Sequence, residues 1–358
     1  MSRRNPESLV LKITLLLTSM LMVMVTTAVA PALPEIQAHF AEVPRAALWV
    51  RLLLTLPALF IAATAPVVGY IIDRIGRKRV LVLSTLLFGI SGVAGYVILT
   101  LPLLLISRAL LGIAVGAQMT AVTTLIADYY TGAERGRFMG LQAAVLGFGA
   151  TAFIALGGIL ADVGWRLPFL THSVAFVILP FVMLALYEPT VGEQCVETPV
   201  PVSDPGLCVA ESIRMARTAD SAERAASSRP LRFLLFVYLL VMGSQIVSYF
   251  IPVQLPFYLQ GAVGASASQS GLALSVTTIL YASASLLYSR VAAWLDHFQV
   301  FVVAFALVGA GYLLIWSAGG WALILLGLSL VGIGLGLLTP NLNVWLADET
   351  PPALRGSS

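Results

Sequence analysis

Long apolar stretches dominate the chain and follow one another with short polar breaks between them. A helix needs about 20 apolar residues to cross the core of a bilayer. These stretches lack the two-residue alternation of barrel strands, so helices are the way for them to satisfy their backbone groups in lipid. The pattern therefore predicts an all-α, polytopic transmembrane bundle. The ten predicted helices run over 9–30, 46–70, 80–99, 102–126, 138–160, 167–187, 232–253, 270–292, 299–317 and 321–346.

One long polar segment interrupts the series after the sixth predicted helix. Residues 188–231 carry many acidic and basic side chains among prolines and serines. Such a composition cannot form a packed core and is typical of a flexible linker. We therefore expect an N-terminal six-helix bundle over 1–187, a linker over 188–231, and a C-terminal half with four helices over 232–358.

Charge supports a membrane protein and predicts its orientation. Only 10% of the 358 residues are charged and 59% are hydrophobic, whereas a soluble domain carries about 25% charged residues. Sixteen of the 20 basic residues fall on one side of the predicted spans, and three on the other. By the positive-inside rule, both termini and the linker are expected in the cytoplasm, with the helices in the inner or plasma membrane. A net charge of +3 gives no reason to expect a nucleic-acid partner.

An internal repeat relates the two halves. Residues 110–136 and 330–356 agree without gaps at nine of 27 positions, and the agreement includes their polar ends. The fourth predicted helix therefore corresponds to the tenth, which indicates two parallel six-helix repeats. On this basis we expect the second repeat to be incomplete, with helices 11 and 12 missing from the chain as given. The identical pairs are Leu110/Leu330, Gly112/Gly332, Ile113/Ile333, Gly116/Gly336, Ala127/Ala347, Asp128/Asp348, Ala133/Ala353, Arg135/Arg355 and Gly136/Gly356.

A basic loop joins the second and third predicted helices. It reads Gly69-Tyr-Ile-Ile-Asp73-Arg74-Ile-Gly76-Arg77-Lys78-Arg79. Gly69 would let two helices approach closely, and Gly76 permits the positive φ of a tight turn. Asp73 is an anion beside helix ends, where it can pair with a helix N-terminus. The basic residues alone would also serve as a topology signal.

This loop resembles the signature loop of the major facilitator superfamily, Gly-x-x-x-Asp-Arg-x-Gly-Arg-Arg. The resemblance implies a transporter of two six-helix repeats, in which the loop latches the halves together in the outward-facing state. It also implies that Asp128, at the end of the fourth helix, pairs with Arg77. The residues expected to form this gate are Gly69, Asp73, Arg74, Gly76, Arg77, Lys78, Asp128 and Arg135.

Arg108 lies inside the fourth predicted helix. Together with Gly112 and Gly116 it resembles the family's helix 4 motif, Arg-x-x-x-Gly followed by small residues. An arginine in a span usually faces a cavity or a partner, and the resemblance implies a role in coupling or substrate contact. The alternative is an arginine that snorkels or is bonded to carbonyl groups. The two glycines have the spacing of close helix packing.

The fifth predicted helix points to one branch of the family. Gly149, Gly157 and Gly158 match part of the sequence Gly-x-x-x-Gly-Pro-x-x-Gly-Gly of drug–proton antiporters, with Phe153 and Ile154 in place of its Gly-Pro pair. The segment 162–169, Asp-Val-Gly-Trp-Arg-Leu-Pro-Phe, resembles the outer loop that follows in the same exporters. The resemblance therefore favours a drug-efflux-like transporter.

Few polar side chains lie within the predicted spans. Each could line a substrate cavity or form a hydrogen bond between helices. All 17 acidic residues fall in loops or at helix ends, so we expect any proton coupling to act through helix-end acids such as Glu35 or Asp128. The candidate cavity residues besides Arg108 are Gln118, Gln142, Gln245, Tyr249 and Asn341.

The sequence offers no enzyme site. His39, His172 and His297 are scattered, and Cys195 and Cys208 lack a metal-ligand spacing. We expect no metal and no cofactor. The predicted function is that of a monomeric secondary transporter which moves a small molecule by alternating access, with efflux as the direction and a proton as candidate counter-ion. The alternatives are an uptake permease for a sugar or metabolite, and a transport-inactive fragment.

Overall fold

The computed structural model describes residues 8–188 and 231–349, and every regular element in these ranges is helical. Nine helical segments of the described residues are long and apolar enough to cross a membrane. A further long helix, α10 (Leu231–Ala262), covers the seventh predicted span. The membrane-protein fold class is confirmed. Both chain ends and nearly all of the predicted linker, including Arg355 and Gly356 of the repeat, lie outside the described residues.

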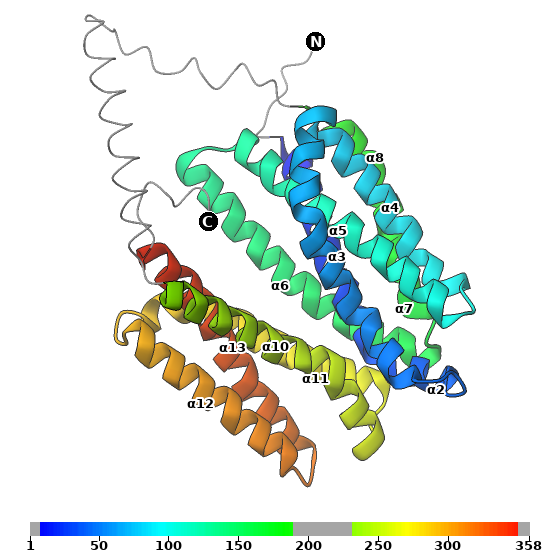
Figure 1. The fold of residues 1–358 in the computed structure, drawn as a ribbon, viewed down its shortest axis with the longest axis vertical. Coiled ribbons are helices and arrows are strands. Elements are labelled where there is room, and N and C mark those ends of the chain that lie inside the picture. Colours follow the sequence, from blue (N-terminus) through cyan, green and yellow to red (C-terminus); the bar gives the residue numbers. More distant parts are fainter. Residues whose placement is uncertain (1–7, 189–230, 350–358) are drawn as a thin grey trace, which may run out of the picture.

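The N-terminal half forms one bundle and the C-terminal helices form a second group beside it (Figure 1). The first half contains α1 (Leu9–Thr27), η1 (Ala30–Ala32), α2 (Leu33–His39), α3 (Ala46–Ile75), α4 (Arg77–Val97), α5 (Leu101–Tyr129), α6 (Gly132–Val163), α7 (Leu167–Leu170), η2 (Thr171–Ser173) and α8 (Val174–Ala185). The second contains α10, α11 (Ala267–Val291), α12 (His297–Trp316) and α13 (Trp321–Glu349).

Proline accounts for the break at the end of the first predicted span. The first span bends after Thr27 into η1 and α2, which begin around Pro31 and Pro34. Proline has no backbone N–H, so it breaks a helix interior but is accepted at a helix start. By contrast, α10 continues through Pro252 and Pro256. Helices in lipid tolerate such breaks because neighbouring groups satisfy the freed carbonyls.

Small residues bring α3 and α5 into close contact. A Cβ atom added to Gly112 would lie 2.5 Å from the carbonyl oxygen of Pro57, and one on Gly116 would lie 3.1 Å from that of Ile61. Backbone atoms this close leave no room for a side chain. The predicted close packing at Gly112 and Gly116 is therefore present.

The same contact recurs between α11 and α13. A Cβ atom on Gly332 would lie 2.5 Å from the carbonyl oxygen of Thr277, and one on Gly336 would meet that of Tyr281. These four residues stand 220 positions after the four of the first half. The pair α11 and α13 therefore repeats the pair α3 and α5, down to the glycines and carbonyl groups that touch, as expected for parallel repeats.

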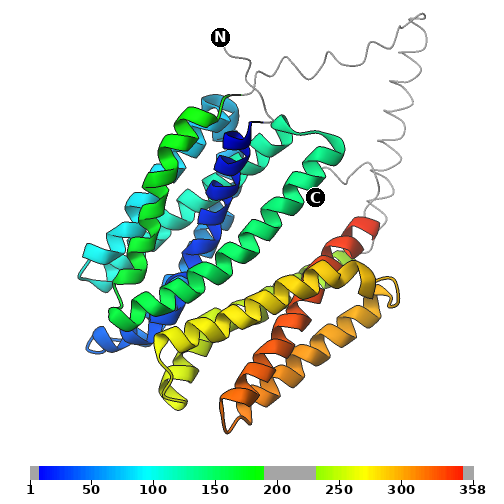
Figure 2. The same cartoon turned by 180° about the vertical axis from the view of Figure 1, so that it is seen from behind.

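The two halves meet mainly where α6 and α11 cross. A Cβ atom on Gly158 of α6 would lie 2.7 Å from the carbonyl oxygen of Ala267, and one on Gly271 of α11 would lie 2.8 Å from that of Ile154. We name the two membrane faces by a residue on each: the Gly76 face and the Asp162 face. Figure 2 shows α6 and α11 close together at the Asp162 face and diverging toward the Gly76 face.

Candidate functional site

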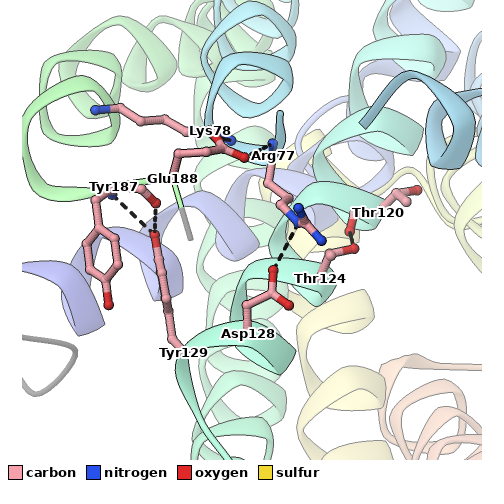
Figure 3. A network of polar contacts seen from close by, with 8 residues as sticks. All are labelled: Arg77, Lys78, Thr120, Thr124, Asp128, Tyr129, Tyr187 and Glu188. Atoms are coloured by element: carbon pink, nitrogen blue, oxygen red, sulfur yellow. Dashed lines mark hydrogen bonds and ion pairs between the residues drawn. The ribbon is translucent and has the colours of Figure 1, made fainter. Parts of the chain in front are cut away.

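The loop at the Gly76 face adopts the turn that its sequence predicts. Gly76 has φ of 99° and separates α3 from α4. In the first turn of α4, Nε of Arg77 lies 3.0 Å from Oδ2 of Asp128 at the end of α5 (Figure 3). Both side chains are about one-fifth exposed, at 21% and 19%. The pairing of Arg77 with Asp128 is thus present in the structure.

Glu188 completes this network from the end of the bundle's last helix. Its carboxylate accepts hydrogen bonds from the backbone N–H groups of Arg77 at 2.6 Å and Lys78 at 2.9 Å (Figure 3). The first N–H groups of a helix have no partner within the helix, and the helix dipole favours an anion there. Gly76 leaves the room, because a Cβ atom on it would lie 2.9 Å from the carboxyl group of Glu188.

Two tyrosines hold the chain next to Glu188. The hydroxyl group of Tyr129 donates to the carbonyl oxygen of Tyr187 and accepts from its N–H group at 3.2 Å. Glu188 could not be predicted as a site residue, because its partners are more than 100 residues away in the sequence. The only signal was an acid directly after the sixth predicted helix.

Other residues of the predicted gate are not engaged in this network. Asp73, Arg74 and Arg135 are exposed, and the guanidinium of Arg74 stacks on the ring of Tyr70 at 4.3 Å. The helix N-terminus in this loop is occupied by Glu188, which corrects the expectation for Asp73. A Cβ atom on Gly69 would meet nothing within 4 Å, so the close helix approach expected there is absent from the described residues. The side of α3 that carries Gly69 therefore has open space there, while the neighbouring Val68 and Ile72 are buried.

Arg108 is fully buried inside the N-terminal bundle. Its Nη2 donates to the carbonyl oxygen of Gly92 at 3.2 Å, and its guanidinium lies 4.9 Å from the ring centre of Phe169. The glycines of α4 make room for this cluster, since a Cβ atom on Gly92 would collide with His172. These surroundings match the alternative interpretation, in which Arg108 is bonded to a carbonyl group and is not a substrate contact.

The other candidate polar residues lie mostly at helix contacts. Gln118 donates to the hydroxyl of Thr85 at 3.3 Å, and Gln142 donates to that of Ser19 at 2.7 Å. Gln245 is exposed on α10, and Tyr249 is half-buried on the same helix.

Asn341 belongs to a separate network in the second half. It is buried in α13, and its Oδ1 accepts from the hydroxyl of Tyr288 at 2.9 Å. Its Nδ2 donates to the backbone carbonyl of His297 at 3.0 Å. Asn341 thus ties α13 to α11 and to the start of α12.

A cavity of about 240 Å³ lies between the two halves. None of the six predicted cavity residues lines it, because those side chains serve packing within each half or lie elsewhere on the helices. No acidic, basic or histidine side chain contributes to its described wall. The lining residues are Thr26, Thr27, Ala30, Ala150, Ile154, Ser248, Ile251, Pro252, Leu274, Thr277, Thr278, Tyr281 and Leu335.

The hydroxyl groups of this wall are mostly used as donors within their own helices. Thr27 donates to the carbonyl oxygen of Val23 at 2.9 Å, and Thr278 donates to that of Leu274 at 3.0 Å. Thr277 makes the same kind of bond, at 3.2 Å. A hydroxyl that has donated its hydrogen offers a ligand only its lone pairs and its carbon atoms. The wall is therefore apolar with scattered acceptors.

The sequence contained a weak signal for this cavity. Thr26-Thr27 and Thr277-Thr278 are paired hydroxyl residues within or at the end of predicted spans. Threonine also bonds to its own helix, so such pairs do not by themselves indicate a cavity. No group of three or more His, Cys, Asp or Glu within 8–188 and 231–349 could hold a metal ion.

Comparison with known families and proteins gives matches over most of the chain. The family model of the Major Facilitator Superfamily matches residues 15–358. Multidrug resistance protein 1 of Bacillus subtilis is 36% identical over 127 residues, which are 35% of this chain and 32% of that protein. The class H tetracycline resistance protein of Pasteurella multocida is 28% identical over 162 residues, 45% of this chain and 40% of that protein. The matched segments thus span less than half of either relative.

Solved structures share the fold over nearly the whole chain. A D-xylose–proton symporter superposes with a TM-score of 0.72 at 18% identity, covering 97% of this chain and 84% of the symporter. A bacterial homologue of the human lysosomal transporter Spinster, inward-facing and unoccupied, superposes with a TM-score of 0.74 at 17% identity, covering 97% and 76%. At these identities the likeness concerns the fold.

Proposed function

The chain belongs to the Major Facilitator Superfamily, and on that premise we propose that it exports small, weakly polar molecules from the cell by alternating access. The observation that carries the proposal is the cavity between the two repeats, whose wall combines helices of both halves. Transporters built from repeats bind substrate at the repeat interface and expose it to each side in turn. The names of the relatives, a multidrug and a tetracycline resistance protein, support outward transport.

The wall of the cavity supports an uncharged substrate. Burying a charge without a partner is costly, and no charged side chain of the described wall would pair with one. The hydroxyl groups of Thr27, Thr277 and Thr278 have donated their hydrogens and offer acceptors, and Ser248 adds one further hydroxyl, which together suit a ligand with one or two N–H or O–H groups on an apolar body. A sugar fits less well, because its many hydroxyl groups need donors as well as acceptors.

The orientation follows from the basic loops. Arg77, Lys78 and Arg79 stand at the Gly76 face, as do Arg135 and Arg137. The positive-inside rule makes this the cytoplasmic face. The halves touch at the opposite, outer face and diverge toward the cytoplasm. We therefore interpret the described state as inward-facing.

Transport by the purified chain in liposomes tests the proposal. Uptake into vesicles of an uncharged lipophilic dye is compared with that of a permanently charged dye and of a sugar. Thr278→Phe would fill the cavity and should lower the rate of dye transport about tenfold or more, equivalent to about 1.4 kcal/mol or more in the barrier. The control is Thr123→Phe, because Thr123 is an exposed threonine on α5 with the same bond to its own helix.

Two outcomes would contradict the proposal. One is transport of the sugar or the charged dye in preference to the uncharged dye. The other is a Thr278→Phe variant that transports the dye as fast as wild type, which would place the substrate path elsewhere.

A further inference from the structure

The two halves are joined at the Asp162 face by a carboxylate on a helix end. Asp162 is the penultimate residue of α6, in the first half, and α11 of the second half begins at Ala267. Oδ1 of Asp162 accepts from the N–H group of Ala267 at 2.7 Å, and both carboxylate oxygens lie 3.2 Å from the N–H group of Ser268. An acid of one repeat thus occupies the first turn of a helix of the other.

This contact is separate from the cap that α11 makes for itself. Ser266 accepts from the N–H group of Gln269, and the side chain of Gln269 accepts from the N–H group of Ser266 at 3.0 Å. That capping box leaves the N–H groups of Ala267 and Ser268 without acceptors in their own helix. Asp162 supplies those acceptors, so its bonds act between the halves and are not needed for α11 to begin.

Three further hydrogen bonds cross between the halves within the described residues, and in one of them the hydroxyl of Ser275 on α11 donates to the carbonyl oxygen of Thr151 on α6 at 3.2 Å. Nε2 of Gln260 donates to the carbonyl oxygen of Pro31 at 2.9 Å, and Nε of Arg51 donates to Oε1 of Gln254 at 3.2 Å. Each has a neutral acceptor. Among these described bonds, those of Asp162 bring a negatively charged acceptor to the positive end of a helix dipole, whereas the bond of Arg51 is charge-assisted through its donor.

The surroundings of Asp162 allow the contact to open. Its side chain is exposed, so water can replace the carboxylate on the two N–H groups and can hydrate the carboxylate itself. An exposed carboxylate at a helix N-terminus contributes a modest free energy, which suits a contact that forms and breaks in each cycle. Directly beneath it, Gly158 and Gly271 make the tight α6–α11 crossing.

We infer that Asp162 is a positioning residue that holds the Asp162 face closed, and that the halves separate there only when its carboxylate leaves the first turn of α11. The inference rests on the proposed alternating access. In that cycle the inward-facing state contains the bond and the outward-facing state lacks it. Weakening the bond therefore shifts the population toward the outward-facing state. The size of the shift equals the free energy by which the bond favours the closed face.

Distances between spin labels across the Asp162 face test the inference without any substrate. Labels at Thr100→Cys and Ser317→Cys, both exposed at this face in different halves, are read in a chain with Cys195 and Cys208 replaced by serine. Wild type should show mainly the short distance. Asp162→Ala should increase the ratio of long to short distances about three- to fivefold, the scale of losing a charge at a helix end. Asp162→Asn retains one acceptor oxygen, so its ratio of long to short distances should lie between those of wild type and Asp162→Ala.

Two control variants separate this effect from general ones. Glu42→Gln removes one exposed negative charge from the same face, and Gln269→Ala weakens the cap that α11 makes for itself. Neither should change the distance ratio. If Asp162→Ala and Asp162→Asn leave the ratio at the wild-type value, or if Gln269→Ala shifts it equally, the inference is wrong.

The measurement is independent of the transport assay. A shift in distances with no transport of any substrate would support the role of Asp162 and oppose the proposed function. Transport with no shift in distances would support the proposed function and oppose the role of Asp162.

Discussion

The guanidinium of Arg77 lies 3.0 Å from the carboxylate of Asp128, which joins the start of α4 to the end of α5. Both helices belong to the N-terminal bundle, so this ion pair organises one half of the molecule. Glu188 anchors the same turn of α4 from the last segment of that bundle. The described polar network at the Gly76 face therefore lies within one repeat, with Asp73 exposed beside it.

The ion pair should contribute measurably to stability. Arg77→Ala and Asp128→Ala, measured singly and together, should give a coupling free energy of about 1 kcal/mol, because both side chains are largely but not fully buried. The measurement is the free energy of unfolding in detergent from a denaturant series. A coupling indistinguishable from zero would mean that the two charges act independently.

Glu188 should act as the cap of α4. Glu188→Ala leaves the N–H groups of Arg77 and Lys78 without their acceptor and should lower the free energy of unfolding by about 1 kcal/mol. Glu188→Gln retains an acceptor and should lose less. Asp73→Ala, which removes an exposed acid of the same loop, is the control and should change little. Equal losses in Glu188→Ala and Asp73→Ala would refute the cap.

The glycine contacts predict opposite effects for one substitution. Gly112→Ala forces α3 away from α5 and should destabilise the protein by about 1–3 kcal/mol. Gly140→Ala has open space around its Cβ position within α6 and should be neutral or stabilising by up to about 1 kcal/mol. Thermal unfolding of the two variants measures the difference in stability. Gly332→Ala should lose about as much stability as Gly112→Ala.

Arg108 should be unreachable from water. In a chain with Cys195 and Cys208 replaced by serine, Arg108→Cys should react with a water-soluble thiol reagent far more slowly than Thr278→Cys, since Arg108 is fully buried and Thr278 lines the cavity. Fast labelling at position 108 would indicate that this residue lies on the substrate path.

Arg108→Lys should be less stable than wild type, because an ammonium group lacks the planar guanidinium that bonds to Gly92 and at the same time lies over the ring of Phe169.

Substrate binding should vary little with pH. The described wall of the cavity contains no carboxylate, imidazole or amine, so no such lining group changes its charge in the physiological range. The dissociation constant of an uncharged ligand, measured by calorimetry from pH 5.5 to 8, should therefore change less than about twofold. A tenfold change that the ligand's own chemistry does not explain would require a titrating group at the site.

The residue pattern of the sequence was sufficient for the membrane fold, the repeat and the local features of the signature loop. Apolar length predicts a span, because lipid demands an unbroken run of such residues. Gly76 predicts a turn, because positive φ is a local property of the backbone. The offset of 220 positions predicted which helices correspond, and the glycine contacts of α5 and α13 then follow it.

Tertiary structure alone decided which polar groups face one another. Arg108 and Gln118 are polar residues within apolar spans, as cavity residues are. In the fold, however, α5 packs on α4 so that both side chains bond to residues of α4. Glu188 and Asp162 were both acids at helix ends, and only the fold brings each to the first turn of a distant helix. The physical reason is that sequence periodicity shows how far an element is apolar, whereas the partner of a polar group depends on how helices far apart in the chain are rotated and packed.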